Sequence, residues 1–218
     1  MNLLNKNIKA VGFDLDDTLY FPKRNDEIPR LFCEAIASVL QIPSKEVIDF
    51  YQKNIVQYGN SPQTARAFCN GRVSDTLLDT MFLDVLEGNE EIDLAQNDHR
   101  LYSLITDLAT QYKIFLVTGN RKPHAIRKLN AIGLEVATFN ATRYGAEDKT
   151  EGMRSIAAQL GVPLVSMMYT GDQEVPDISC AKALEMTTAK ITSQHDYMTQ
   201  ADFQVRQVHD LRNILLGN

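Results

Sequence analysis

The chain has 218 residues, of which 44% are hydrophobic and 23% charged, as in an ordinary globular protein with a sizeable core. Its 22 basic and 28 acidic side chains give a formal net charge of −6, which argues against a nucleic acid or an anionic membrane as partner. No apolar run approaches the roughly 20 residues that a membrane-spanning helix needs.

The first predicted element is a strand in "IKAVGFDL", residues 8–15, a short apolar run typical of a strand buried on both faces. It leads directly into three carboxylates, Asp14, Asp16 and Asp17. Like charges at this density repel one another, and each carboxylate is costly to remove from water unless a cation meets it. We therefore expect a metal ion at the end of this strand.

The next segment, residues 21–111, shows only helical periodicity. Serine, a good helix-starting residue, stands at three of the expected starts, and Gly59 is expected to end the second helix. The expected helices begin near Ile28, Ser44, Ser61, Ser74 and His99. A helical insert of this length separates the first strand from the rest of any sheet.

From residue 112 onward the pattern alternates between strand and helix. Strands are expected at 113–120, 134–140, 166–172 and 187–192, and helices at 124–133, 152–161, 177–186 and 208–216. Such alternation implies parallel strands joined by right-handed crossovers. The fold class is therefore α/β, a doubly wound parallel sheet formed by residues 1–20 and 112–218, with a helical cap domain at 21–111.

Open α/β sheets bind ligands outside the carboxyl ends of their strands, so the polar residues at those ends belong together. They are Asp14 and Asp16 after the first strand, Thr118 and Gly119 after the second, Lys149 before a core helix, and Asp172 and Asp177 in "YTGDQEVPD". Carboxylates, a hydroxyl and an ammonium group are thus expected to face one crevice.

Taken in order, the DxDxT motif, the threonine after strand two, the lysine and the GDxxxxD motif resemble the haloacid dehalogenase-like hydrolases. The resemblance covers nearly the whole chain. It implies a Rossmann-like core with a small α-helical cap, and hydrolysis of a small phosphorylated metabolite that requires Mg²⁺.

The resemblance also implies roles for these residues. Asp14 would be the nucleophile that forms an aspartyl-phosphate, and Asp16 the general acid and base. Mg²⁺ would be held by Asp14, the Asp16 main-chain carbonyl and Asp172. Thr118 and the Gly119 N–H would bind phosphoryl oxygens, Lys149 would offset negative charge, and Asp177 would support the site through Lys149 or a metal-bound water.

Several residues have a second interpretation. Asp177 is also placed to cap the helix that follows it. Lys149 lacks the Pro-x-Pro that commonly follows the lysine in relatives, so Arg143 is an alternative source of the cation. The basic run from Arg121 to Lys128 is interpreted as a solvated helix face, and all four histidines as structural or surface residues.

The acid at position 16 distinguishes between reactions within the family. Dehalogenases of this family lack it, since no alkoxide leaving group needs a proton, and phosphonatases also lack it and use a cap lysine to form an imine. A phosphatase is therefore favoured, with a phosphomutase or a sugar-phosphate phosphatase as alternatives. A receiver-like signalling domain is disfavoured, because the expected third strand, ending in "ATFN", carries no carboxylate to accept a phosphoryl group.

The substrate is sought in the cap. The segments "LYFPK", "YQKNIVQYGN" and "NRKPHAIRKLNAIGL" partly resemble the pyrimidine 5′-nucleotidase branch, which suggests a nucleoside monophosphate. Arg66 and Arg72 are candidates for holding a second anionic group, although two surface arginines on a helix are an equally good interpretation.

The remaining expectations concern location. Cys33, Cys69 and Cys180 are odd in number and widely spaced, with no CxxC pair. The N-terminal residues contain no apolar signal-peptide core. Together these features predict a cytoplasmic protein with reduced thiols.

Overall fold

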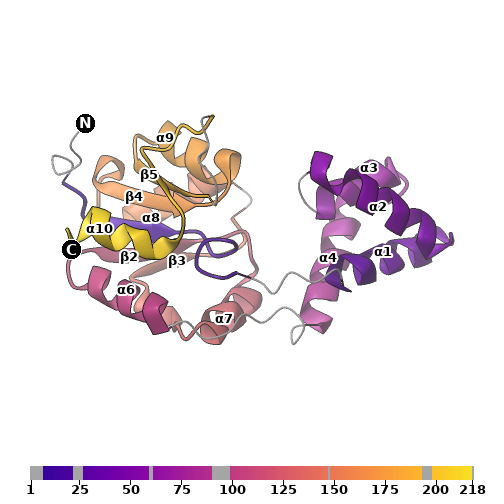
Figure 1. Cartoon of the computed structure of the whole chain (residues 1–218), viewed down its shortest axis with the longest axis horizontal. Helices are drawn as coiled ribbons and strands as arrows, with labels where there is room; N and C mark the ends of the chain where they lie inside the picture. The colour runs from indigo at the N-terminus through magenta and orange to yellow at the C-terminus, as the bar shows by residue number, and fades with distance from the viewer. Residues whose placement is uncertain are drawn as a thin grey trace. The chain divides into compact units, whose positions relative to one another are not determined.

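The computed structural model describes residues 7–21, 27–58, 61–89, 99–146, 148–192 and 198–217. Contacts divide the chain into two compact units. The core unit is Met1–Pro22 with Ala95–Asn218, and the helical unit is Lys23–Leu94. Figure 1 labels the elements of each unit.

The described part of the core unit contains a six-stranded sheet in the order β3-β2-β1-β4-β5-β6, with every pair parallel. Its strands are β1 (Ala10–Phe13), β2 (Lys113–Val117), β3 (Ala141–Arg143), β4 (Met167–Gly171), β5 (Thr187–Ile191) and β6 (Phe203–Val205). The sequence of β1 places it at the centre, between β2 and β4, because all four of its residues are buried. The predicted doubly wound parallel sheet is confirmed.

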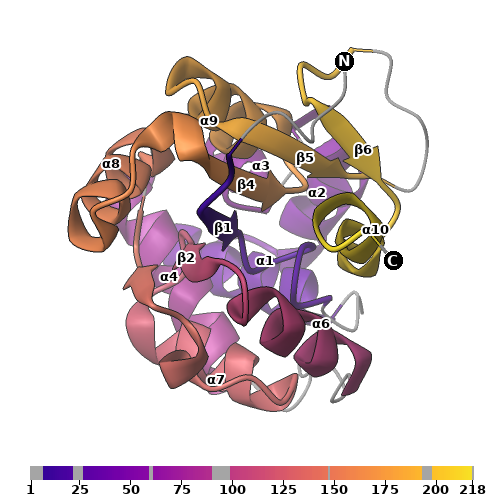
Figure 2. The same ribbon diagram turned by 90° about the vertical axis from the view of Figure 1, so that its left-hand side faces the viewer.

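Helices cover both faces of this sheet, as Figure 2 shows. They are α6 (His99–Ala109), α7 (Lys122–Ala131), α8 (Lys149–Leu160), α9 (Cys180–Ala183) and α10 (Leu211–Leu215). Along β2 the side chains alternate between the faces: Ile114 and Leu116 pack with α6, α7 and α10, whereas Phe115 and Val117 pack with α8 and α9. This alternation explains why the strand sequences are apolar throughout rather than at every second residue.

The position of α6 corrects the expected domain boundary. The sequence placed residues 99–111 in the cap, but α6 belongs to the core unit. The reason is its apolar face: Leu101, Leu104, Ile105 and Leu108 are buried in the cluster that also contains β1 and β2. Periodicity shows that a helix has such a face but does not show which element covers it.

The helical unit consists of α1 (Glu27–Leu40), α2 (Ser44–Tyr58), α3 (Ser61–Cys69) and α4 (Asp75–Gly88). These helices pack around a cluster of buried side chains that includes Phe32, Ile36, Val47 and Leu78. Ser74 caps α4 as predicted, since its hydroxyl accepts a hydrogen bond from the Leu77 N–H. The predicted helix end at Gly59 lies outside the described residues.

The third strand begins later than predicted. Residues Val136–Thr138 form a 3₁₀ turn, and β3 starts only at Ala141. The side-chain oxygen of Asn140 accepts a hydrogen bond from the Ile114 N–H at 2.7 Å, so a side chain takes the place of a strand partner there. The strand β6 was not predicted, because its three residues are too few to show a period.

The segment after β4 also differs from the prediction. A single helix was expected at 177–186, whereas Glu174–Ser179 forms a π-helical turn that leads into the short α9. All three cysteines are free thiols. Within the described residues, no helix has the length and hydropathy needed to cross a bilayer.

Candidate active site

Three neighbouring strands bring polar residues to one edge of the sheet. Because β2, β1 and β4 are adjacent and parallel, their carboxyl ends lie side by side. Asp14 follows β1, Thr118 follows β2 and Asp172 follows β4. The Asp14 N–H extends the pairing by donating to the Thr170 carbonyl at 2.9 Å. The register thus places the side chains expected at the strand ends together.

Lys149 joins this group from α8. Its Nζ lies 2.8 Å from Asp14 Oδ1 and 2.5 Å from Asp177 Oδ1, and all three side chains are less than a tenth exposed. Lys149 is the first residue of α8, behind the N-cap Asp148. The alternative cation, Arg143, has an exposed position on β3. Lys149 is therefore the cation that contacts the predicted nucleophile.

Burial and repulsion perturb the acids of this cluster. One carboxylate oxygen from each of Asp14, Asp172 and Asp177 lies within 4.8 Å of the others. Burial raises the pKa of Asp14 to about 7, with Lys149 opposing the shift and Asp177 adding to it. Burial and the charges of Asp177 and Asp14 likewise raise the pKa of Asp172 to about 7. The cluster therefore holds more negative charge than one lysine neutralises.

Asp177 is held firmly in place. Its Oδ1 accepts from Lys149, and its Oδ2 accepts from the Gln173 N–H at 3.0 Å. The π-helical turn brings this side chain back against the end of β4, where a Cβ on Gly171 would lie 2.3 Å from the Asp177 carboxyl carbon. Gly171 is thus required by close approach, a role that the sequence interpretation missed although the Gly-Asp pair marked the position.

Asp16 points to a different set of partners from those of Asp14. Its Oδ1 accepts a hydrogen bond from Lys128 Nζ at 2.6 Å, and its Oδ2 accepts from Asn120 Nδ2 at 2.7 Å. Among the described residues, its carboxylate is not part of the acidic cluster. Lys128 was predicted on a solvated helix face, but its side chain is only 8% exposed, and it stands over the Tyr20 ring. That prediction is wrong for Lys128.

Thr118 and Gly119 are the two predicted site residues that follow β2. The buried Thr118 hydroxyl accepts hydrogen bonds from the Asn120 backbone N–H at 3.1 Å and from its side-chain amide at 2.8 Å. Its own proton is therefore available for another acceptor. A Cβ on Gly119 would meet nothing within 4 Å, so this backbone borders open space.

His124, on the first turn of α7, is buried, and neither ring nitrogen has a hydrogen-bond partner. Burial lowers its pKa to about 4, and the charge of Lys128 acts in the same direction. The predicted structural role remains a prediction, but a surface position is excluded.

The low pKa of His124 has a consequence for stability. The folded-state pKa of His124 lies below the ordinary value. The contribution of the neutral His124 side chain to the free energy of unfolding is therefore complete above about pH 6.5 and is lost as the pH falls towards 4. We expect His124→Leu to remove this acid sensitivity. The free energy of unfolding, measured in urea at pH 7 and pH 4, should fall by about 3 kcal/mol less in the variant than in the wild type. His99→Leu, at an exposed position on α6, is the control and should lose as much free energy of unfolding between pH 7 and pH 4 as the wild type. An equal loss in His124→Leu would contradict the prediction.

The two candidate substrate arginines make contacts within the helical unit. Arg66 pairs with Asp79 at 2.5 Å and with Asp75 at 3.6 Å. Arg72 donates to the Cys69 and Phe68 carbonyls and lies over the Phe68 ring. These contacts favour a structural role for both, and binding of an anion would have to compete with them.

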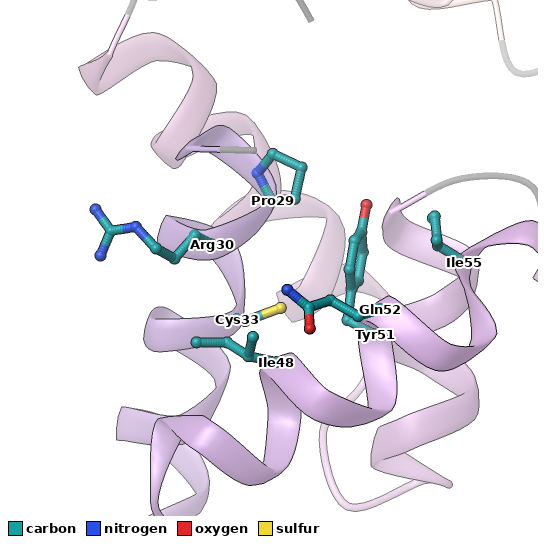
Figure 3. Close-up of a pocket in the computed structure, with 7 residues that line it drawn as sticks. All are labelled: Pro29, Arg30, Cys33, Ile48, Tyr51, Gln52 and Ile55. Atoms are coloured by element: carbon teal, nitrogen blue, oxygen red, sulfur yellow. The ribbon is translucent and has the colours of Figure 1, made fainter. Parts of the chain in front are cut away.

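The helical unit has a cavity of its own, of about 260 Å³, between α1 and α2 (Figure 3). Neither Arg66 nor Arg72 lines it. Of the residues that do, Arg30 is paired with Glu34 and Glu27, and burial raises the pKa of the Cys33 thiol to about 11. A protonated thiol is a poor nucleophile, so Cys33 does not make this cavity a reaction centre.

The comparisons with known proteins agree with this arrangement. Residues 8–185 match the model of the haloacid dehalogenase-like hydrolase family. No curated protein matches the chain significantly in sequence.

Solved structures share the fold over nearly the whole chain. A haloacid dehalogenase (HAD) phosphatase from Thermococcus onnurineus is 22% identical with a TM-score of 0.66, covering 97% of this chain and 99% of its own. The HAD-hydrolase YfnB from Bacillus subtilis, bound to magnesium, is 15% identical with a TM-score of 0.62 and coverage of 97% and 100%. A β-phosphoglucomutase from Clostridium difficile is 16% identical with a TM-score of 0.62 and coverage of 96% of both chains.

The structural matches are too distant in sequence to show more than the fold, but the family model spans most of the chain, including every strand-end motif up to Asp177. The resemblance inferred from those motifs is thereby confirmed. The chain is a member of the haloacid dehalogenase-like hydrolase family.

Proposed function

We propose that the protein is a Mg²⁺-dependent phosphatase that hydrolyses a small phosphate monoester through an aspartyl-phosphate on Asp14. One observation carries the proposal: the buried Asp14 carboxylate is paired with the equally buried Lys149 and lies beside two further carboxylates. A carboxylate at the end of a central strand, within reach of a cation, suits covalent attack on phosphorus.

The acidic cluster fits a magnesium ion. Asp172 Oδ1 is buried without a hydrogen-bond partner, and burial raises the pKa values of Asp14 and Asp172 even though Lys149 opposes the shift at Asp14, as expected where buried carboxylates outnumber the cations beside them. Both oxygens of Asp177 are engaged by Lys149 and Gln173, so Asp14 and Asp172, with the Asp16 main-chain carbonyl, are the better ligand set. When bound, the ion would supply positive charge against the phosphoryl oxygens.

The residues of the chain divide the chemistry between them. Asp14 attacks phosphorus, and the bond from phosphorus to the leaving oxygen breaks while Asp16 gives that oxygen a proton. Asp16 then takes a proton from the water that attacks the aspartyl-phosphate, which releases phosphate and restores Asp14. Lys149, Thr118 and the Gly119 N–H stabilise the negative charge on the phosphoryl group.

The alternatives differ in what they require. A sugar-phosphate phosphatase would use the same Asp14 and Asp16 and differs only in its substrate, whereas a phosphomutase would pass the phosphoryl group from Asp14 to a hydroxyl of a sugar phosphate and not to water. A receiver-like domain needs a phosphoryl-accepting carboxylate after its third strand. Here β3 ends at Arg143 and is followed by Tyr144 and Gly145, which disfavours that class.

We propose a nucleoside 5′-monophosphate as the first substrate class to test. We also propose that the protein is cytoplasmic. The support for the substrate class is the partial likeness of residues 120–134 to pyrimidine 5′-nucleotidases. A panel of nucleotides and sugar phosphates, compared by kcat/KM, tests this choice. A higher kcat/KM for sugar phosphates than for every nucleotide would overturn it.

Metal removal tests the proposed reaction. We expect the purified protein to release phosphate from p-nitrophenyl phosphate in Mg²⁺, and EDTA to lower the rate at least about tenfold, because the charge of the acidic cluster is then unbalanced. Added Mg²⁺ should restore the rate, and it should raise the thermal unfolding temperature, since a ligand that binds the folded state stabilises it. A rate and an unfolding temperature that do not respond to the metal would contradict the proposal.

A further inference from the structure

The side chain of Asp16 is held at both oxygens by residues that follow β2. Lys128 Nζ, from α7, lies 2.6 Å from Oδ1, and Asn120 Nδ2 lies 2.7 Å from Oδ2. Asn120 Oδ1 accepts in turn from Lys128 Nζ at 3.3 Å, so the two holding residues also contact each other. A carboxyl group bound in this way cannot rotate about its last side-chain bond without breaking hydrogen bonds.

The hydrogen bonds that orient Asp16 continue to Thr118. The same Asn120 amide that contacts Asp16 donates to Thr118 Oγ1 at 2.8 Å. One continuous set of hydrogen bonds therefore connects Lys128, Asp16, Asn120 and Thr118. The position of Asp16 is thereby tied to that of Thr118, which is proposed to bind the phosphoryl oxygens.

The burial of Lys128 argues against a solvated surface pair. The Lys128 side chain is 8% exposed and that of Asp16 is 39% exposed, so the ammonium approaches the carboxyl group from the protein side. Ordering a long lysine side chain and removing its charge from water are both costly. The Tyr20 ring, 5.1 Å from Nζ, provides part of the compensation through a cation–π contact.

We propose that Lys128, with Asn120, is a positioning residue that orients the Asp16 carboxyl group for proton transfer to the leaving oxygen. The inference rests on the proposed phosphatase function. Each carboxyl oxygen has two lone-pair directions, and the two donors occupy one on each. The exposed side of Asp16 remains open for the transferred proton.

The step concerned is the first half of the reaction. As Asp14 bonds to phosphorus, the bond between phosphorus and the leaving oxygen breaks and its electron pair stays on that oxygen. The Asp16 proton then forms the new O–H bond, and no oxidant or reductant takes part. A leaving group that is stable as an anion depends little on this proton, whereas a more basic one depends on it strongly.

Two similar esters test this dependence in the full chain. We compare kcat/KM, which includes the departure of the leaving group, for p-nitrophenyl phosphate and for phenyl phosphate, whose phenolate is the more basic. Lys128→Met should lower kcat/KM for phenyl phosphate about tenfold more than for p-nitrophenyl phosphate. Lys128→Arg, which keeps a charged donor, should recover part of this loss. Lys122→Met, at an exposed position on the same helix, should resemble the wild type.

Each outcome decides the inference. Equal losses on the two esters, or a Lys128→Met variant that matches Lys122→Met, would overturn it. If circular dichroism shows that Lys128→Met is unfolded, Asn120→Ala must show the same bias against phenyl phosphate, and its absence would overturn the inference. A wild-type protein that cleaves neither ester in Mg²⁺ would refute the proposed function, whereas an active wild type with unbiased variants refutes only the role of Lys128.

Discussion

Replacing the proposed nucleophile, Asp14→Asn, should lower kcat/KM for p-nitrophenyl phosphate at least about 10⁴-fold, the scale of losing a covalent nucleophile. An amide of the same shape cannot form the acyl-phosphate. The fold should persist, because Lys149 keeps its 2.5 Å contact with Asp177. The substitution removes the Asp14–Lys149 ion pair, but it also relieves the cost of burying the Asp14 charge, which is the cause of its raised pKa.

The measurement is phosphate release over time, together with a search for a phosphorylated protein that is stable in acid and labile in base. The wild type should form this species and Asp14→Asn should not. Asp107→Asn on α6, the same change in a half-exposed ion pair with Arg212 of α10, is the matched control and should retain wild-type activity. Multiple turnovers by Asp14→Asn would remove Asp14 from its proposed role.

Removing the buried cation, Lys149→Met, should affect both activity and stability. Activity should fall about 10²–10³-fold, as is typical when one group that stabilises transition-state charge is lost. The free energy of unfolding without metal should fall by roughly 3–5 kcal/mol, because Asp14 and Asp177 are then buried without a compensating charge. Denaturant unfolding in EDTA measures this change.

A second lysine–aspartate pair supplies the control. Lys182 on α9 lies 2.9 Å from Asp202, but both side chains are a quarter or more exposed. Lys182→Met should therefore lower stability by no more than about 1 kcal/mol. Mg²⁺ should recover part of the stability of Lys149→Met, since a bound cation would again offset the acidic cluster. Equal stability losses in Lys149→Met and Lys182→Met would contradict this account of the site.

The elements of both units could be predicted because their signals are local. Strand β1 is apolar over its whole length and is followed by carboxylates, α1 has strong helical spacing, and α4 has a serine cap. The short β6 and the 3₁₀ turn at Val136–Thr138 were missed or misassigned. Each contains three residues, too few for either the strand or the helix pattern to repeat, so the surrounding contacts decide its conformation.

The partners of the Asp16 side chain could not be predicted from the sequence. Lys128 is 112 residues away in sequence and lies within a basic run that has the pattern of an exposed helix face. Only the packing of α7 beside the end of β1 turns one lysine of that run inward. Residue order alone does not distinguish an exposed basic helix from a basic helix with a single buried lysine.

The amino-acid sequence by itself determined the α/β class, the helical insert and the residue types at each strand end, because hydrophobic periodicity and strand-to-polar transitions arise between near neighbours in the chain. Tertiary structure alone decided that Lys149 rather than Arg143 meets Asp14, that α6 belongs to the core unit, and that Asp177 and Lys128 hold their partners. These outcomes depend on strand order and register, which are set by contacts between segments far apart in the chain.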